Sequence, residues 1–359
     1  MFSIGERTPM LRFQRFLVPG VLGFLALFFT QSCGSKIKLL CPTNASAQLT
    51  GAPCDIYGAA QTACVAAFST VRALYRAYDG PLYQVTRKLD MTATSIGVLS
   101  DGYANAAVQD GFCAKTTCTI TKIYDQSPHH NDLTVAPPGA SRKGTGPGGQ
   151  DLPAVADSLP ITAGGHKVYG VYFSAGMGYR NDATSGIAVN GQPEGVYMVG
   201  SGIHINSGCC FDFGNAETNN HDDGPGHMDA VNLRCDKEGN PHVGLDLEAG
   251  VYPPFPIPAG VPFVTAMGVN DGRENYAVYW GNAQAECLTA SGFLPLPTRE
   301  YVPMRQEGAV ILGIGGDNSN WGVGSFFEGA MTKGIPSPVA LIAVQANVVS
   351  VGYAAGPNP

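Results

Sequence analysis

Pro241-His-Val-Gly-Leu-Asp-Leu-Glu248 is the stretch of this 359-residue chain that most directly predicts its fold. Three apolar residues alternate with other residues in it: Val243, Leu245 and Leu247. Such alternation predicts a β-strand with one apolar face. The same period of two places Asp246 and Glu248 together on the opposite face. The stretch therefore predicts a strand of a layered β structure that carries two carboxylates.

Short strand-like segments recur along the chain, and glycine, proline, asparagine or aspartate separates most of them. They cover residues 81–87, 119–124, 167–174, 195–199, 227–233, 263–269, 276–279 and 309–314. Many short strands separated by turn residues predict an all-β fold, a β-sandwich or barrel. One helix is expected over Ser69–Tyr78, with Ser69 as its N-cap, and a long Gly/Pro-rich loop over 137–150.

The composition limits the classes of function. Only 14% of the residues are charged, and there are 47 glycines and 26 prolines, which argues against a helical bundle. The hydrophobic content of 44% is sufficient for a large core. The formal net charge is −7 and no basic stripe is present, so nucleic acid is not an expected partner. No composition shift or repeat divides residues 51–359, which we expect to form one domain.

The first 33 residues predict an export signal. Three arginines, Arg7, Arg12 and Arg15, precede an apolar run over 16–29, as in secretory signals. Cys33 would be a site of lipid attachment in a bacterial host. Residues 34–50 are expected to be a linker, and the protein is expected to be extracellular.

Ten cysteines also indicate an oxidising compartment. No Cys-x-x-Cys pair occurs, which argues against zinc. Cys209 and Cys210 are adjacent, and their Cα atoms would lie closer than the ~4.4–6.8 Å of a usual disulfide. A bond between them would close a tight ring, which persists only where its surroundings hold it. Alternatively, each pairs elsewhere or both are buried thiols. Two acids, Asp212 and Glu217, follow the two cysteines in the sequence, which is a composition typical of a binding or catalytic site.

Another acid, Asp317, lies on a separate segment from Asp246 and Glu248, at the end of Ile311-Leu-Gly-Ile-Gly-Gly-Asp317. Glycines before the acid allow a ligand to approach the backbone. Two carboxylates from separate strands at one cleft are what glycoside hydrolysis requires, one as nucleophile or base and one as acid. Alternatively, these acids are ordinary solvated residues.

The polar loop over 221–227 could instead hold a metal ion. The candidate ligands are His221, Asp222, Asp223 and His227. A polar loop gives the same residues by chance, and no metal or cofactor is expected.

Motifs in unbroken order over residues 51–353 carry a family resemblance. They lie at 51–57, 63–67, 70–75, 80–85, 123–127, 130–134, 136–139, 178–181, 209–218, 226–228 and 311–320. Together they resemble family 54 glycoside hydrolases, the fungal-type α-L-arabinofuranosidases B. The resemblance implies a β-sandwich catalytic domain and a retaining mechanism. It also implies that Glu248 is the nucleophile and Asp317 the general acid/base. Asp246 and the backbone of Gly316 match groups that hold sugar hydroxyls.

The resemblance also assigns the cysteines. It implies that Cys209–Cys210 is a vicinal disulfide that packs against the arabinose. It implies two further bonds, Cys54–Cys64 and Cys113–Cys118. Cys235 and Cys287 are additional to the family pattern, and we expect them to bridge each other.

The sequence departs from the family at three places. Ala249 stands where the family usually has an asparagine. The loop between His227 and Pro241 is shorter and lacks a tryptophan. The usual C-terminal arabinose-binding module is not expected.

The expected function is that of a secreted, monomeric, exo-acting α-L-arabinofuranosidase. Its substrate would be an arabinose-containing polysaccharide or oligosaccharide, such as arabinoxylan or arabinan, and no protein partner is expected. The alternative is a non-catalytic carbohydrate-binding β-sandwich.

Overall fold

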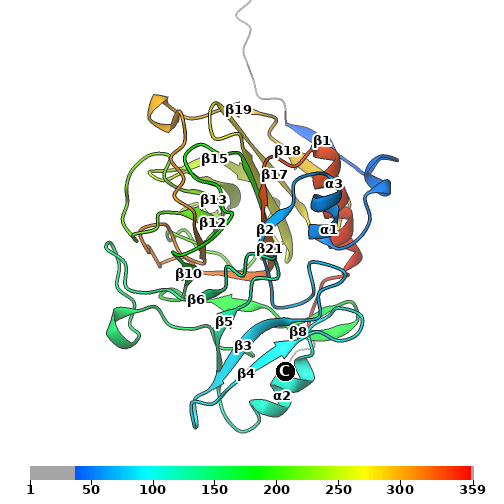
Figure 1. Cartoon of the computed structure of the whole chain (residues 1–359), viewed down its shortest axis with the longest axis vertical. Helices are drawn as coiled ribbons and strands as arrows, with labels where there is room; N and C mark the ends of the chain where they lie inside the picture. Colours follow the sequence, from blue (N-terminus) through cyan, green and yellow to red (C-terminus); the bar gives the residue numbers. More distant parts are fainter. Residues whose placement is uncertain (1–36, 357–359) are drawn as a thin grey trace, which may run out of the picture. The chain divides into compact units, whose positions relative to one another are not determined.

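The structure is a computed structural model that describes residues 37–356. Its main feature is two large antiparallel sheets (Figure 1). The first sheet has the order β1-β18-β17-β16-β11-β21-β2, with β19 paired to β17 and β9 paired to β21. Its strands are β1 (Lys38–Leu40), β2 (Cys64–Ser69), β9 (Val171–Phe173), β11 (Glu194–Gly200), β16 (Val264–Asn270), β17 (Asn275–Asn282), β18 (Leu288–Ala290), β19 (Leu294–Pro295) and β21 (Gly324–Lys333).

The second sheet has the order β15-β14-β13-β12-β20-β10-β6-β5-β3-β4. Its strands are β3 (Pro81–Arg87), β4 (Ala93–Gly97), β5 (Cys118–Ile123), β6 (Leu133–Val135), β10 (Tyr179–Asn181), β12 (Asp212–Ala216), β13 (Asp229–Cys235), β14 (Pro241–Asp246), β15 (Val251–Pro256) and β20 (Ala309–Leu312). A small third sheet pairs β22 (Ala354–Ala355), β7 (Pro160–Ala163) and β8 (His166–Tyr169).

Helices are few and short in the part of the chain that the structure describes. They are α1 (Pro53–Ala59), α2 (Ala106–Phe112) and α3 (Pro338–Ser350), with 3₁₀ turns η1 (Ser46–Gln48), η2 (Pro147–Gly149) and η3 (Arg299–Tyr301). α1 and α3 lie side by side next to β2 (Figure 1). No helix among residues 37–356 is long and apolar enough to cross a membrane. The predicted export signal, including Cys33, lies outside the described residues.

Aromatic side chains join the two large sheets. Phe213 of β12 packs edge-on against Phe68 of β2, with ring centroids 6.0 Å apart. It also contacts Phe326 of β21 at 5.5 Å. In the predicted strand, Val243, Leu245 and Leu247 are all buried, as the alternation requires. The core therefore lies between the sheets, and the prediction of a β-sandwich is confirmed.

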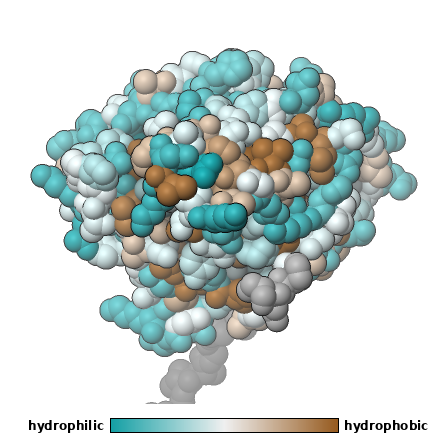
Figure 2. Space-filling model, turned by 90° about the horizontal axis from the view of Figure 1, so that it is seen from below, coloured by the Kyte–Doolittle hydropathy of each residue, from teal (hydrophilic) through white to brown (hydrophobic). Residues whose placement is uncertain are grey.

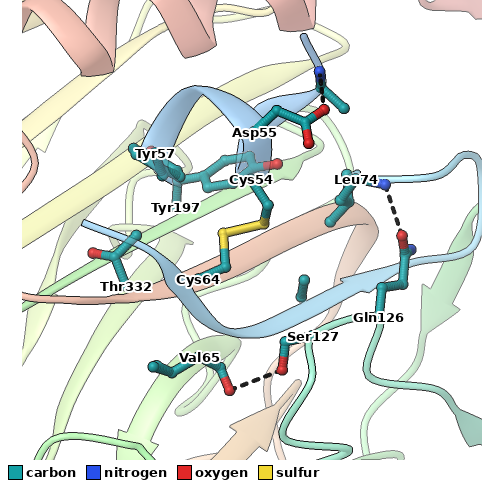
Figure 3. Close-up of a disulfide and its surroundings, with 12 residues drawn as sticks. Cys54, Asp55, Tyr57, Cys64, Val65, Leu74, Gln126, Ser127, Tyr197 and Thr332 are labelled. Carbon is teal, nitrogen blue, oxygen red and sulfur yellow. Dashed lines mark hydrogen bonds between the residues drawn. A yellow bond between two sulfur atoms is a disulfide. The ribbon is translucent and has the colours of Figure 1, made fainter. Parts of the chain in front are cut away.

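The expected helix over Ser69–Tyr78 is wrong. Ser69 ends β2, and several backbone groups after it bond to distant segments. The Leu74 N–H donates to the Gln126 side chain at 2.7 Å (Figure 3). The Leu74 carbonyl accepts from Cys54 N at 2.9 Å. These distant partners replace the i→i−4 bonds that a helix would need. The Cys54–Cys64 disulfide beside them joins α1 to β2.

The expected bond between Cys235 and Cys287 is also wrong. Cys287 is bonded to Cys41, and Cys235 is a free thiol. β1 pairs with β18 so that Leu40 faces Leu288, and this register places the two bonded cysteines next to each other. Within the predicted linker over 34–50, β1 and Cys41 are therefore attached to the domain by strand pairing and by a disulfide.

The face that carries β3, β4 and α2 is mostly hydrophilic (Figure 2). Hydrophobic residues form small groups among hydrophilic ones there. The turn between β3 and β4 exposes Leu89 and Met91, and α2 exposes Val108. Scattered exposed apolar side chains of this kind are normal for protein surfaces.

Candidate active site

A cavity of about 260 Å³ brings the six predicted site residues together. They are Cys209, Cys210, Asp246, Glu248, Gly316 and Asp317. The volume is below the ~300–1,000 Å³ that is usual for drug-sized ligands. The cavity therefore suits one small sugar ring better than an oligosaccharide.

A tight turn directs Glu248 toward the cavity. β14 ends at Asp246, so Glu248 lies beyond the strand and not on the predicted alternating face. Its φ is +63°, in the left-handed region that costs energy for a residue with a side chain. The Glu248 N–H donates to Oδ1 of Asp246 at 3.2 Å, and the Tyr301 hydroxyl donates to the Glu248 carbonyl at 2.8 Å. These bonds hold the strained turn.

The turn after β20 carries Asp317. Oδ1 of Asp317 accepts a hydrogen bond from the Ser319 N–H at 2.8 Å, which orients the carboxylate. The Gly315 N–H closes the turn by donating to the Ser319 carbonyl at 2.9 Å. Arg180 of β10 is buried and donates to the Gly316 carbonyl at 2.6 Å. The turn is thus fixed from both sides.

Cys209 and Cys210 are bonded to each other, and the peptide bond between them is cis. The Cys210 N–H donates to the Ser319 carbonyl at 3.2 Å. Sγ of Cys210 lies 3.9 Å from Oδ2 of Asp246. The pair therefore forms a sulfur wall of the cavity, tied to the same turn that carries Asp317.

Glu217 is a buried acid beside the cavity. Burial raises the pKa of Glu217 to about 7, and its carboxyl group interacts with that of Glu248. Burial also raises the pKa of Glu248, and the charge of Glu217 raises it further. A Cβ on Gly316 would overlap Oε2 of Glu217 and would lie 3.1 Å from Oε2 of Glu248. Only glycine fits between the turn and these two carboxyl groups.

Arg234 of β13 offsets part of the negative charge. It lines the cavity. Burial raises the pKa of Asp246 to about 7, and Arg234 opposes this rise. Burial and the charge of Asp246 also raise the pKa of Asp212, whose carboxylate accepts a hydrogen bond from Asn232.

Sequence reasoning missed the contributions of Arg180, Arg234 and Asp222 to the site. Asp222 lines the cavity, although we considered it only as a metal ligand. Arg234 shares a strand face with Asn232 by the period of two, which could have suggested its direction. Arg180 lies in a family motif and pairs with Asp182, but the bonds that tie it to the site go to the backbone carbonyls of Gly316 and Glu217, which no sequence pattern identifies.

The metal candidates are only partly grouped. Asp223 and His227 lie with Glu307, which was not predicted, so that their ligand atoms are all within 4.8 Å. Nδ1 of His227 is 2.8 Å from Oε1 of Glu307. Burial opposes the charge of Glu307, but hydrogen bonds from His227 and Thr218 lower its pKa. His227 and Glu307 already bond to each other, and the predicted ligand His221 is not part of this group.

Comparisons with known proteins identify the family. A family model described as the catalytic part of α-L-arabinofuranosidase B matches residues 53–354. This chain belongs to that family. The matched range includes both large sheets apart from β1, and every residue of the cavity.

Individual members of the family are similar over most of this chain. An α-L-arabinofuranosidase B of Emericella nidulans is 46% identical over 90% of this chain and 67% of its own length. An arabinofuranosidase/β-xylosidase of Trichoderma koningii is 48% identical over 85% of this chain and 63% of its own length.

A solved structure has the same fold. It is an arabinofuranosidase complexed with arabinofuranosyl-α-1,2-xylobiose, with a TM-score of 0.82 and 42% identity over 86% of this chain and 66% of its own. This chain therefore spans about two thirds of the length of these relatives.

Proposed function

We propose that residues 51–359 form the catalytic domain of an exported, exo-acting α-L-arabinofuranosidase that works with retention of configuration. The observation that carries this proposal is the cavity of about 260 Å³ that holds Glu248, Asp317 and the sulfur wall together. A non-catalytic binding site would not need two acids on separate turns at one small cavity. Family membership supports the same activity.

In the first step, a carboxylate oxygen of Glu248 attacks the anomeric carbon of the arabinofuranosyl unit. The bond from that carbon to the leaving oxygen breaks, and Asp317 gives its proton to this oxygen. The product is an ester between Glu248 and the sugar. In the second step, water attacks the same carbon, Asp317 takes a proton from the water, and the Glu248 carboxylate leaves. Two inversions give net retention.

Attack requires Glu248 in its ionised form. Burial raises the pKa of both acids, and the charge of Glu217 raises the pKa of Glu248 further, so the proton of the pair is held on Glu248 in the free protein. We infer that Glu217 takes this proton when the substrate binds and that its O–H then donates to the Glu248 carboxylate. Glu217 is then a positioning residue, because it acts through Glu248.

The remaining groups bind the sugar. Asp246 can accept hydrogen bonds from sugar hydroxyls, and the sulfur wall of Cys209 and Cys210 can contact the apolar C–H face. The small cavity fits a terminal unit, which is the basis for exo action. The substrate class is an arabinofuranosyl side chain or end on a polysaccharide or oligosaccharide. The apolar N-terminal run and the disulfides support export.

The test is hydrolysis of 4-nitrophenyl α-L-arabinofuranoside, with NMR detection of the first anomer released. We expect the α-anomer first, and we expect Glu248→Gln to lose at least about 10³-fold in kcat. Asp317→Asn should also lose activity. Glu307→Gln, an acid outside the cavity lining, is the matched control and should keep it. A folded protein that binds arabinose but does not hydrolyse the substrate would instead be the non-catalytic sandwich.

A further inference from the structure

Trp321 is an exposed tryptophan close to the catalytic cavity. The chain has only two tryptophans, and the other, Trp280, is buried in β17. Trp321 keeps 43% of its surface exposed. Among the residues that the structure describes, Phe293 is the other large aromatic side chain with comparable exposure. An exposed tryptophan that is held in place often marks a binding surface.

The backbone of Trp321 is fixed against the cavity wall. Its N–H donates to the Cys209 carbonyl at 2.9 Å. Its carbonyl accepts a hydrogen bond from the Asn206 side chain at 2.9 Å. Ser319, two residues earlier, lines the cavity, as does Asp317. The ring therefore leaves the chain at the end of the turn that carries the proposed acid/base.

Arg142 lies over the Trp321 ring, with its guanidinium carbon 3.5 Å from the ring centroid. It comes from the Gly/Pro-rich loop, whose Gly139 is so close to the Asp317 turn that a Cβ there would lie 2.7 Å from the Asp317 carbonyl oxygen. The next residue, Ala140, donates from its N–H to the Asn220 carbonyl at 3.1 Å. The loop is thus held between the turn of Asp317 and the segment that leads to the cavity residue Asp222.

Arg142 has donors available for a ligand. Arg142 is half-buried, and its Nε is a buried atom without a hydrogen-bond partner. Its side chain has no carboxylate partner within the described part of the chain, so the N–H groups of its two terminal nitrogens are the donors that a ligand could reach. The guanidinium packs on the Trp321 ring. In such stacking the N–H groups lie in the plane of the guanidinium and point away from its centre, so they remain able to donate. A guanidinium carries five N–H donors, which suits hydroxyl-rich ligands.

We propose that Trp321 and Arg142 form the subsite for the leaving-group sugar and that this sugar is a pyranose, as in a xylan-type backbone. The proposal rests on the proposed function, because it places the leaving group on the side of Asp317, which protonates the leaving oxygen. A pyranose chair with equatorial substituents presents flat C–H faces that pack against an aromatic ring. A puckered furanose, as in arabinan, matches such a ring less well. Arg142 donates to the hydroxyls at the edge of the pyranose.

Tryptophan fluorescence tests the subsite without turnover. We would titrate Glu248→Gln with xylotriose, which contains only pyranose rings. Because Trp280 is buried, a saturable change in emission is expected to come from Trp321, and the added change Trp321→Phe should remove most of it. An arabinofuranose trisaccharide also enters the cavity, so calorimetry compares how much affinity each trisaccharide loses on the added change Trp321→Ala; the loss should be at least about threefold larger for xylotriose. An equal loss for the two trisaccharides, or no response to xylotriose, would overturn the proposal.

Kinetics give the second test. The two substrates are an arabinosylated xylotriose and methyl α-L-arabinofuranoside, whose leaving group has no ring. For Trp321→Ala, the ratio of kcat/KM for the first substrate to that for the second should fall about three- to tenfold, mainly through KM. Trp321→Tyr should restore part of the ratio, and Arg142→Ala should lower it. Phe293→Ala is the matched control for loss of an exposed aromatic ring and should leave the ratio unchanged.

The outcomes separate this proposal from the proposed function. An unchanged ratio in Trp321→Ala, with both substrates hydrolysed, would overturn the subsite and leave the arabinofuranosidase activity standing. If the unmodified protein hydrolyses neither substrate, the proposed function fails, and the fluorescence titration with xylotriose still decides whether a pyranose binds at Trp321.

Discussion

The carboxyl groups of Glu217 and Glu248 interact with each other beside Gly316, although they come from different strands of the same sheet. Glu217 directly follows β12, and Glu248 follows β14 after a left-handed turn. Burial disfavours the charge of each carboxylate, and the charge of Glu217 raises the pKa of Glu248 further. The acid that we propose as nucleophile is therefore tuned by a second acid.

Glu217→Gln should move the acid limb of kcat/KM to lower pH. The charge of Glu217 raises the pKa of Glu248. A neutral amide removes this repulsion and still offers an N–H donor, so Glu248 ionises at a lower pH. Because kcat/KM follows the ionisation of the free enzyme, the active fraction at acidic pH should rise. The measurement is a pH profile on the 4-nitrophenyl substrate, with Glu274→Gln, an exposed acid outside the cavity lining, as control. An acid limb that stays in place would contradict the coupling.

Gly316→Ala should reduce activity with little loss of folding. The added methyl group would overlap Oε2 of Glu217 and press on the carboxyl group of Glu248. Displacing a catalytic group by about 1 Å can cost on the order of 10²-fold in rate. Gly111→Ala in α2 is a matched control, because a Cβ there meets no atom within 4 Å. Thermal unfolding of both variants would show whether the lost activity comes from the site. Full activity of Gly316→Ala would mean that the carboxyl groups are loosely held.

The sequence predicted the layered β fold because burial acts locally on every strand. The alternation of Val243, Leu245 and Leu247 records which face is buried, and the structure buries all three. The same alternation failed for Glu248, because the strand ends at Asp246 and a left-handed turn follows. A non-glycine residue with positive φ is imposed by its surroundings, here by the hydroxyl of Tyr301, and leaves no periodic signal.

The errors involve distant partners. The sequence of Ser69–Tyr78 is compatible with a helix, but the backbone N–H of Leu74 in this segment donates to the side chain of Gln126. The partner of Cys287 depends on the pairing of β1 with β18, which no spacing rule provides. The six predicted site residues line one cavity because family motifs carry that three-dimensional information. The roles of these residues in catalysis remain predictions.

Changing both Cys209 and Cys210 to alanine should raise KM more than it lowers kcat. The sulfur wall is proposed to contact the C–H face of the bound sugar, and this contact is similar in the ground state and in the transition state. In the matched control, Cys113 and Cys118 are both changed to alanine; these two residues form a disulfide that does not line the cavity. Steady-state kinetics and thermal unfolding of both double variants separate binding from stability. Equal effects on KM in the two variants would mean that the vicinal pair has no contact with the sugar.

The disulfide between Cys41 and Cys287 gives the last prediction. Alkylation without reduction, followed by peptide mass analysis, should modify Cys235 and leave Cys287 linked to Cys41. The bond joins residues 246 positions apart, so replacing both cysteines with serine should cost about 2–5 kcal/mol of unfolding free energy. Cys235→Ser is the control and should leave the melting temperature unchanged. A peptide that links Cys235 to Cys287 would contradict the strand pairing of β1 with β18, because that pairing places Cys41 beside Cys287.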